Sequence, residues 1–210
     1  MMAGWSPGRL SLAGPTPDLF GVAPGTPGLS EAEAAAAADA PRLLAALADV
    51  VDDGFSVACV AGIDAAEAAR RLGGQPAEID EDWLEDPPFD DESLAIVGVT
   101  DVPGGCIVGQ LWGYRAAQDD VQTRLSKGTV CYGLYANPKS GNQGSIARDG
   151  VIEGWDLHPG GGPRENDTAD EVFASYLCNG DALAYACAYA GLRPTDSRAV
   201  TGRADRWLRL

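Results

Sequence analysis

Residues 94–156 constrain the fold of this chain most, because short apolar runs of strand type alternate there with turns rich in Gly, Pro and Asn. Pro103-Gly104-Gly105 separates the first two runs and Asp149-Gly150 separates the last two, and both turns are typical of antiparallel hairpins. A short amphipathic helix fits residues 116–125, between the hairpins. We therefore expect five strands, at residues 94–100, 106–112, 129–135, 143–148 and 151–156.

The preceding residues add a strand and helices to this stretch. Residues 55–60 are apolar and β-branched, and a helix follows them between Asp64 as N-cap and Gly73 as C-cap. Ser30 has the spacing of a capping box and opens an alanine-rich helix. We expect Pro41 to interrupt that helix, because proline lacks the backbone N–H that an interior helical position donates.

Together these segments predict an α+β fold, with a mostly antiparallel sheet of about five or six strands packed by helices on one face. Residues 30–210 are expected to form a single domain. Residues 1–29 combine five prolines with many glycines and show no apolar period, so we expect a flexible N-terminal arm. Near the other end, residues 172–187 fit the apolar faces of one broken helix or of two short ones.

The formal net charge of −16 is concentrated in the first part of the chain. Residues 1–92 hold 18 acidic and 4 basic side chains, whereas residues 93–210 hold 13 acidic and 11 basic ones. Nucleic acid and anionic membranes require a cationic face, so we expect neither as a partner. A basic protein partner fits this charge, as does high solubility alone. We expect the arginines near the end to pair with carboxylates of the same chain: Arg193, Arg198, Arg203, Arg206 and Arg209.

The densest acidic segment, residues 78–92, holds nine acids interrupted by apolar side chains. It fits either an extended, solvated linker or an acidic surface that binds a cationic protein partner. In the second interpretation, the large apolar side chains anchor the partner. The candidate binding residues of this segment are Asp80, Glu81, Asp82, Trp83, Glu85, Asp86 and Phe89.

Aromatic side chains in or beside the predicted strands form a second candidate surface. They favour packing inside a sheet, but one face of the sheet could present several of them to a small molecule. Trp112 and Tyr114 are the candidate binding residues of this surface. The full aromatic set is Trp112, Tyr114, Tyr132, Tyr135 and Trp155.

Motifs for catalysis are sparse. His158 is the only histidine and could act as a binding residue or as a general base, with Asp156 two residues away. It lies in a loop rich in Pro and Gly, which is a poor mount for catalysis. Carboxylate pairs remain possible among 31 acids, but nothing in the sequence singles one out. The sequence therefore favours a non-catalytic protein.

Motifs for metals, cofactors and membranes are also lacking. The five cysteines include no C-x-x-C pair, so we expect reduced, buried thiols in a cytoplasmic protein and no metal site. Neither a Walker A motif nor a G-x-G-x-x-G fingerprint is present, and we expect no cofactor. No signal peptide or membrane-spanning apolar run is visible in the sequence.

Three runs resemble an actinobacterial family of uncharacterised proteins, known as a domain of unknown function. They are FSVACVAGIDAAEAARRLGG from residue 55, LAIVGVTDVPGGCIVGQLWGYRA from residue 94, and LSKGTVCYGLYANPKSGNQGSIARDGVIEGWDLHP from residue 125. The resemblance covers residues 55–159, about half the chain, and consists mainly of turns and caps. It implies a fold and a bacterial, cytosolic setting, but it does not indicate any reaction. Gln110 departs from the pattern, because an acid is expected there.

Three functions are open from the sequence. The first is a non-catalytic acidic protein that neutralises or regulates a basic protein partner, as immunity proteins and inhibitors do. The second is a small-molecule-binding module that uses the aromatic face of the sheet. The third is a small carboxylate-dependent enzyme of a bacterial biosynthetic or defence locus. The protein is expected to be a monomer or, through an uncapped edge strand, a homodimer.

Overall fold

A computed structural model describes residues 31–50, 54–86, 88, 90–139, 141–156 and 182–210. Its fold is α+β, as the sequence predicts. The predicted N-terminal arm lies outside these residues. No helix in the described part of the chain is long and apolar enough to cross a membrane.

Helices and strands alternate irregularly along the chain. The helices are α1 (Glu31–Ala46), α2 (Ala65–Leu72), α3 (Glu81–Glu85), α4 (Asp119–Leu125) and α6 (Ala182–Tyr189), with 3₁₀ turns η1 (Ser93–Ala95) and η2 (Arg115–Ala117). The strands are β1 (Phe55–Ala61), β2 (Gln75–Pro76), β3 (Ile96–Val102), β4 (Gly105–Leu111), β5 (Val130–Ala136), β6 (Gln143–Arg148), β7 (Val151–Asp156) and β8 (Arg206–Arg209). All six strands expected from the sequence are present, displaced by two residues at most.

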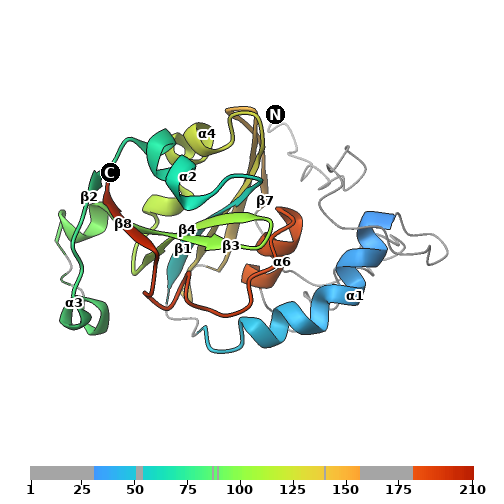
Figure 1. Cartoon of the computed structure of the whole chain (residues 1–210), viewed down its shortest axis with the longest axis horizontal. Helices are drawn as coiled ribbons and strands as arrows, with labels where there is room; N and C mark the ends of the chain where they lie inside the picture. The colour runs from blue at the N-terminus through green and yellow to red at the C-terminus, as the bar shows by residue number, and fades with distance from the viewer. Residues whose placement is uncertain (1–30, 51–53, 87, 89, 140, 157–181) are drawn as a thin grey trace, which may run out of the picture.

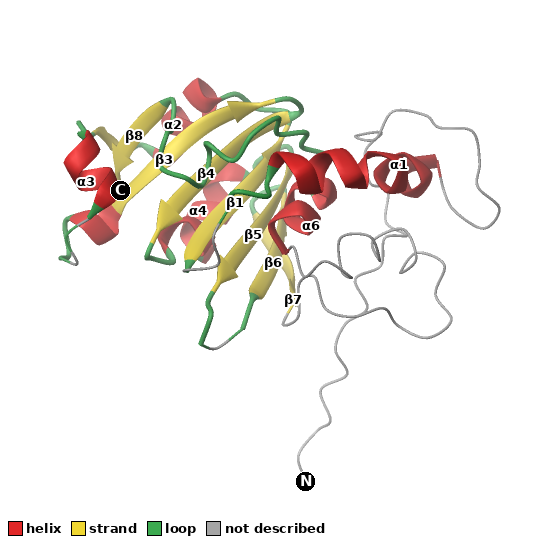
Figure 2. Ribbon diagram, turned by 90° about the horizontal axis from the view of Figure 1, so that it is seen from below, coloured by secondary structure: helices red, strands yellow, loops and turns green. Residues whose placement is uncertain are grey.

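The strands form one sheet in the order β2-β8-β3-β4-β1-β5-β6-β7, and every neighbouring pair is antiparallel. Figure 1 shows β2 and β8 beside the C-terminus, and Figure 2 shows the strands from β8 to β7 side by side in this order. The expectation of five or six strands is therefore too low, because the sheet has eight. The two strands not expected are short. β2 has two residues, and β8 carries only Trp207 and Leu208 between arginines, which is too short an apolar pattern to predict a strand.

Helices cover both faces of the sheet, so the expectation of helices on one face is wrong. Figure 2 shows α1 and α6 on one side and α2 and α4 on the other. All seven residues of β1 are buried, and they alternate between the two sides. Val57 and Cys59 pack in the core with α1 and α6, whereas Ala58 and Val60 pack with α2 and α4. The run at residues 55–61, apolar except for Ser56, is the sequence signal for a strand that helices cover on both faces.

Helix α1 continues through Pro41, which the sequence led us to expect as an interruption. A proline inside a helix costs about 3 kcal/mol, because one hydrogen bond is lost and the ring crowds the preceding turn. Leu43 and Leu47 on the same helix are almost fully buried. Burying each leucine contributes roughly 1.5–3 kcal/mol, which is enough to offset the proline.

Three of the five C-terminal arginines pair with carboxylates of the same chain, as expected. Arg193 lies 2.5 Å from Asp39 of α1, and Arg209 lies 3.4 Å from Glu92. Arg198 pairs with Asp205, whose carboxylate also accepts the backbone N–H of residue 101 in β3 at 2.8 Å. These pairs attach residues 193–209 to α1 and to the sheet edge.

Asp39→Asn should lower the free energy of unfolding by about 1 kcal/mol at neutral pH, because Asp39 binds both Arg42 and Arg193. The hydrogen bond from Arg42, with the charge of Arg193, lowers the pKa of Asp39 below its ordinary value. This stabilisation is therefore complete above the unfolded-state pKa of about 3.9 and is lost as the pH falls through the lower folded-state pKa. Urea unfolding of the unchanged protein and of the variant, from about pH 7 to about pH 2, measures how the stability difference depends on pH. A difference that does not change with pH would contradict the assignment.

Candidate functional site

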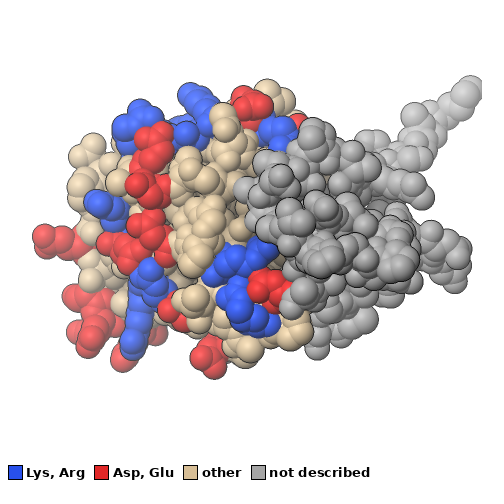
Figure 3. Space-filling view, turned by 45° about the vertical axis from the view of Figure 1, so that its right-hand side comes forward, with Lys and Arg blue, Asp and Glu red and all other residues tan. Residues whose placement is uncertain are grey.

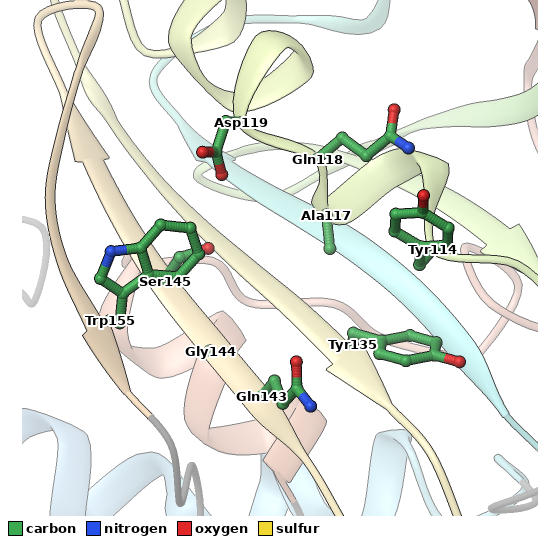
Figure 4. A pocket seen from close by; sticks show the side chains of 9 residues that line it. All are labelled: Tyr114, Ala117, Gln118, Asp119, Tyr135, Gln143, Gly144, Ser145 and Trp155. Atoms are coloured by element: carbon green, nitrogen blue, oxygen red, sulfur yellow. The ribbon is translucent and has the colours of Figure 1, made fainter. Parts of the chain in front are cut away.

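A pocket of about 330 Å³, here called the aromatic pocket, lies between the η2–α4 segment and strands β5, β6 and β7. Tyr135 lies directly opposite Gln143, and Ser145 lies directly opposite Trp155. Directly opposed residues of antiparallel strands point to the same face, so these four side chains share one surface. Figure 4 shows the lining residues, which are Tyr114, Ala117, Gln118, Asp119, Tyr135, Gln143, Gly144, Ser145 and Trp155.

The pocket forms where the layer of helices ends. Further along the same face, Cys131 of β5 and Ala147 of β6 are fully buried in the core that contains α4. Helix α4 has seven residues and leaves the far ends of these strands uncovered. Tyr135 is consequently only half-buried, and Gln143 is exposed.

Three aromatic rings from separate segments surround the opening. Tyr114 precedes η2 and lies 6.0 Å from Tyr135, centroid to centroid, with the ring planes tilted by 59°. Trp155 of β7 stands on the opposite side of the pocket (Figure 4). Tyr114 is 58% exposed and Trp155 is 53% exposed. The rings therefore offer apolar faces to solvent across a small cavity.

Ser145 provides a hydrogen-bond donor at the base of the pocket. Its buried Oγ accepts a hydrogen bond from Nε2 of Gln122 at 2.6 Å, and the same Nε2 donates to the carbonyl of Ala117 at 2.7 Å. These two acceptors fix the orientation of the amide. A Cβ at Gly133 would overlap this amide, so glycine is required beneath it. Since Ser145 accepts from Gln122, its own hydroxyl hydrogen has no acceptor among the described residues and is available to a ligand.

Asp119 is the only charged side chain among the described residues that line the pocket, and no described residue forms an ion pair with it. The next residue, Asp120, behaves differently, because Arg115 lies 2.7 Å from it and Arg124 lies 3.1 Å from it. The hydrogen bond from Arg115, with the charge of Arg124, lowers the pKa of Asp120 below its ordinary value. Asp120 thus pairs with both nearby arginines, and no described residue forms an ion pair with the Asp119 carboxylate.

Gln110 holds the segment that carries Tyr114. Its buried side chain donates from Nε2 to the carbonyls of Leu94 and Ile96, each at 2.9 Å. Its Oε1 accepts the backbone N–H of Arg115 at 2.8 Å. An ionised acid, which the family resemblance leads us to expect here, has no hydrogen to donate to the two carbonyls.

The other aromatic side chains of the predicted surface lie elsewhere. Tyr132 is fully buried on the opposite face, with its ring 5.7 Å from that of Tyr185 and 5.2 Å from that of Tyr189 in α6. Trp112, a predicted binding residue, is 43% exposed but does not line the pocket. Among the predicted binding residues that the structure describes, Tyr114 is the one that lines the pocket.

The predicted acidic surface lies at the other end of the sheet, beside β8. It contains the short helix α3, whose N-cap Asp80 accepts the backbone N–H of Trp83 at 2.9 Å. The ring of Trp83 packs edge-on against Trp207 of β8 at 5.8 Å and attaches the helix to the sheet. Several acidic side chains lie at the left of the view in Figure 3, with basic side chains among them. Four exposed acids of α3 and its C-cap form no ion pair with described residues: Glu81, Asp82, Glu85 and Asp86.

Two predicted binding residues, Phe89 and His158, lie outside the described residues, as does Cys178. The other four cysteines are buried free thiols, as the sequence predicts: Cys59, Cys106, Cys131 and Cys187. Burial raises the pKa of Cys106 to about 12, so this thiol is a poor nucleophile. Within the described ranges, no three His, Cys, Asp or Glu side chains are arranged to hold a metal ion.

Comparisons with known proteins add no further constraint. No protein-family model, curated protein or solved structure matches the chain. The resemblance of residues 55–159 to an actinobacterial family therefore stays a prediction. The function must be argued from the geometry of the chain itself.

Gln110→Glu should lower the free energy of unfolding by about 2–3 kcal/mol at neutral pH, because an ionised carboxylate would face two carbonyl oxygens in a buried site. Such a carboxyl has a raised pKa, so the loss is largest at high pH and shrinks as protonation restores one donor. Urea unfolding at about pH 8 and about pH 5 measures both effects. Gln143→Glu is the matched control, since Gln143 is exposed and its replacement should change stability by less than about 0.5 kcal/mol. Equal losses in the two variants would refute the role of Gln110.

Proposed function

We propose that this protein binds a small organic molecule with a flat apolar face in the aromatic pocket. The observation that supports this proposal is the convergence of Tyr114, Tyr135 and Trp155 around a buried hydroxyl. These rings come from three segments that are distant in sequence. Ligand sites typically combine aromatic walls with a few polar groups that fix orientation.

The dimensions of the pocket suit a small ligand. Ligand pockets span roughly 300–1,000 Å³, and a volume of about 330 Å³ is near the lower limit. One or two rings of a metabolite would fill it. Tyr135, Ser145 and Trp155 belong to strands of the sheet, which holds a site more rigidly than a loop does.

The chemical groups in the pocket favour binding over catalysis. Ser145 has the hydroxyl of a nucleophile, but the described part of the chain contains no histidine to activate it. Asp119 is a single carboxylate, whereas acid–base catalysis by carboxylates usually employs two groups with different pKa values. Aromatic faces and a free hydroxyl are sufficient for recognition.

Trp155→Ala should raise the Kd of a pocket ligand about five- to tenfold, because stacking against an aromatic ring contributes on the order of 1 kcal/mol. Ligands are first found by a thermal-shift screen of a metabolite library with the whole chain, and their Kd values are then measured by calorimetry. Trp112→Ala is the matched control, since Trp112 has similar exposure but does not line the pocket. It should change the Kd by less than about twofold. A library without ligands, or equal effects of both substitutions, would exclude the proposal.

A second candidate function is the binding of a basic protein through α3, as in an immunity or inhibitor protein. The supporting observation is that Glu81, Asp82, Glu85 and Asp86 are exposed and form no ion pair with described residues. Carboxylates arranged in this way attract a cationic surface and accelerate association. The contact of Trp83 with Trp207 fixes the helix on the sheet without using these acids.

Neutralising α3 tests this second function. The combined variant Glu81→Gln, Asp82→Asn, Glu85→Gln and Asp86→Asn removes four charges and should abolish capture of a basic protein from a lysate of the source organism. The unchanged chain should release that protein as the salt concentration rises, because salt screens exposed charges. Trp155→Ala serves as the control and should capture as much protein as the unchanged chain. A lysate that yields no salt-sensitive partner would exclude this function and leave the pocket proposal intact.

A further inference from the structure

The charge of the aromatic pocket indicates which molecules it selects. Among the described residues that line it, Asp119 is the single charged side chain, and none is Lys or Arg. Figure 4 shows the Asp119 carboxylate directed from α4 toward the sheet, on the side where Trp155 and Ser145 lie. We propose, building on the proposed function, that the ligand is a small organic cation of the alkylammonium class, held by this carboxylate and the aromatic rings.

The neighbouring arginines, Arg115 and Arg124, form ion pairs with Asp120 and not with Asp119. Arg115 donates to Asp120 and also to Oε1 of Gln118, and Arg124 donates to the second oxygen of Asp120. Arg124 also donates to the carbonyl of Leu72 at 3.0 Å. Both guanidinium groups are thus held by acceptors outside the Asp119 carboxylate. An ammonium ligand would place a cation in direct contact with the Asp119 carboxylate, which no described residue does.

The aromatic rings favour the same charge. The face of an aromatic ring is negative, so it attracts a cation that lies within about 6 Å of the ring centre. Tyr114 and Tyr135 stand on one side of the pocket and Trp155 on the other, so a cation between them meets rings from two directions (Figure 4). Alkyl groups on the nitrogen would contact the rings, whereas the charge would remain near the carboxylate.

The electrostatic field of the whole chain also favours a cationic ligand. A formal net charge of −16 draws cations toward the surface and repels anions. This long-range term is reduced by salt, whereas contacts inside a partly enclosed pocket are reduced less. The local and the global contributions can therefore be separated by experiment.

The test compares cations with neutral molecules of the same shape. Choline and benzyltrimethylammonium are titrated beside the compounds in which carbon replaces the nitrogen. The indole N–H resonance of Trp155, assigned with Trp155→Phe, reports binding in the whole chain. Each cation should bind at least about tenfold more tightly than its neutral counterpart, and Asp119→Asn should remove most of this difference without changing the Kd of the neutral compound.

Asp82→Asn is the matched control, because it removes one exposed, unpaired carboxylate at the other end of the sheet. It should change the Kd of the cation by less than about twofold. Equal binding of cation and neutral compound, or equal effects of Asp119→Asn and Asp82→Asn, would overturn the cation proposal and leave the pocket as a site for neutral ligands. Cations that fail to shift the Trp155 resonance would also overturn it, and the library screen would still decide whether the pocket binds anything.

Discussion

The burial of β1 on both faces is the constraint on which the rest of the structure depends. This strand lies between β4 and β5, and all seven of its residues are buried, so two layers of helices are required. On one side α2 and α4 close the core. On the other side all eight residues of α6 are buried, and α1 packs with this helix in the same core. Helix α1 is therefore part of the core despite its proline.

The aromatic pocket follows from the unequal lengths of these layers. Strands β5, β6 and β7 extend past the end of α4, and the same face that buries Cys131 presents Tyr135 to solvent. Two glutamines maintain the boundary between core and pocket. Gln122 crosses β5 to reach Ser145, and Gln110 joins the start of β3 to the segment that carries Tyr114. Gln110 both donates and accepts, whereas Gln122 donates from Nε2 to Ala117 and Ser145, and neither amide adds charge to an acidic chain.

Local signals in the sequence predicted most of the fold. Apolar runs between turns located six strands, and Asp64 and Gly73 marked the ends of α2 with a side-chain cap and a left-handed residue. Features that depend on distant residues were not predictable in this way. Strand β8 is defined by pairing with β3, and the helix through Pro41 by burial beside α6. The pocket was predictable only in part. Its aromatic residues were recognised in the sequence, but the register of the strands decides which of them meet. It places Tyr135 and Trp155 on one face, whereas Tyr132 faces the core on the other.

The position of β8 has a consequence for how the chain folds during synthesis. Ile96 of β3 pairs with Arg209, and the backbone N–H of Leu210 donates to the carbonyl of Ala95. Until residues 206–209 have left the ribosome, β3 has a free edge and β2 has no partner strand. The sheet can then form around β1 but cannot be completed, so its closure follows translation of this segment. In the folded chain the acidic helix α3 lies beside β8, and charged side chains near a sheet edge disfavour edge-to-edge association.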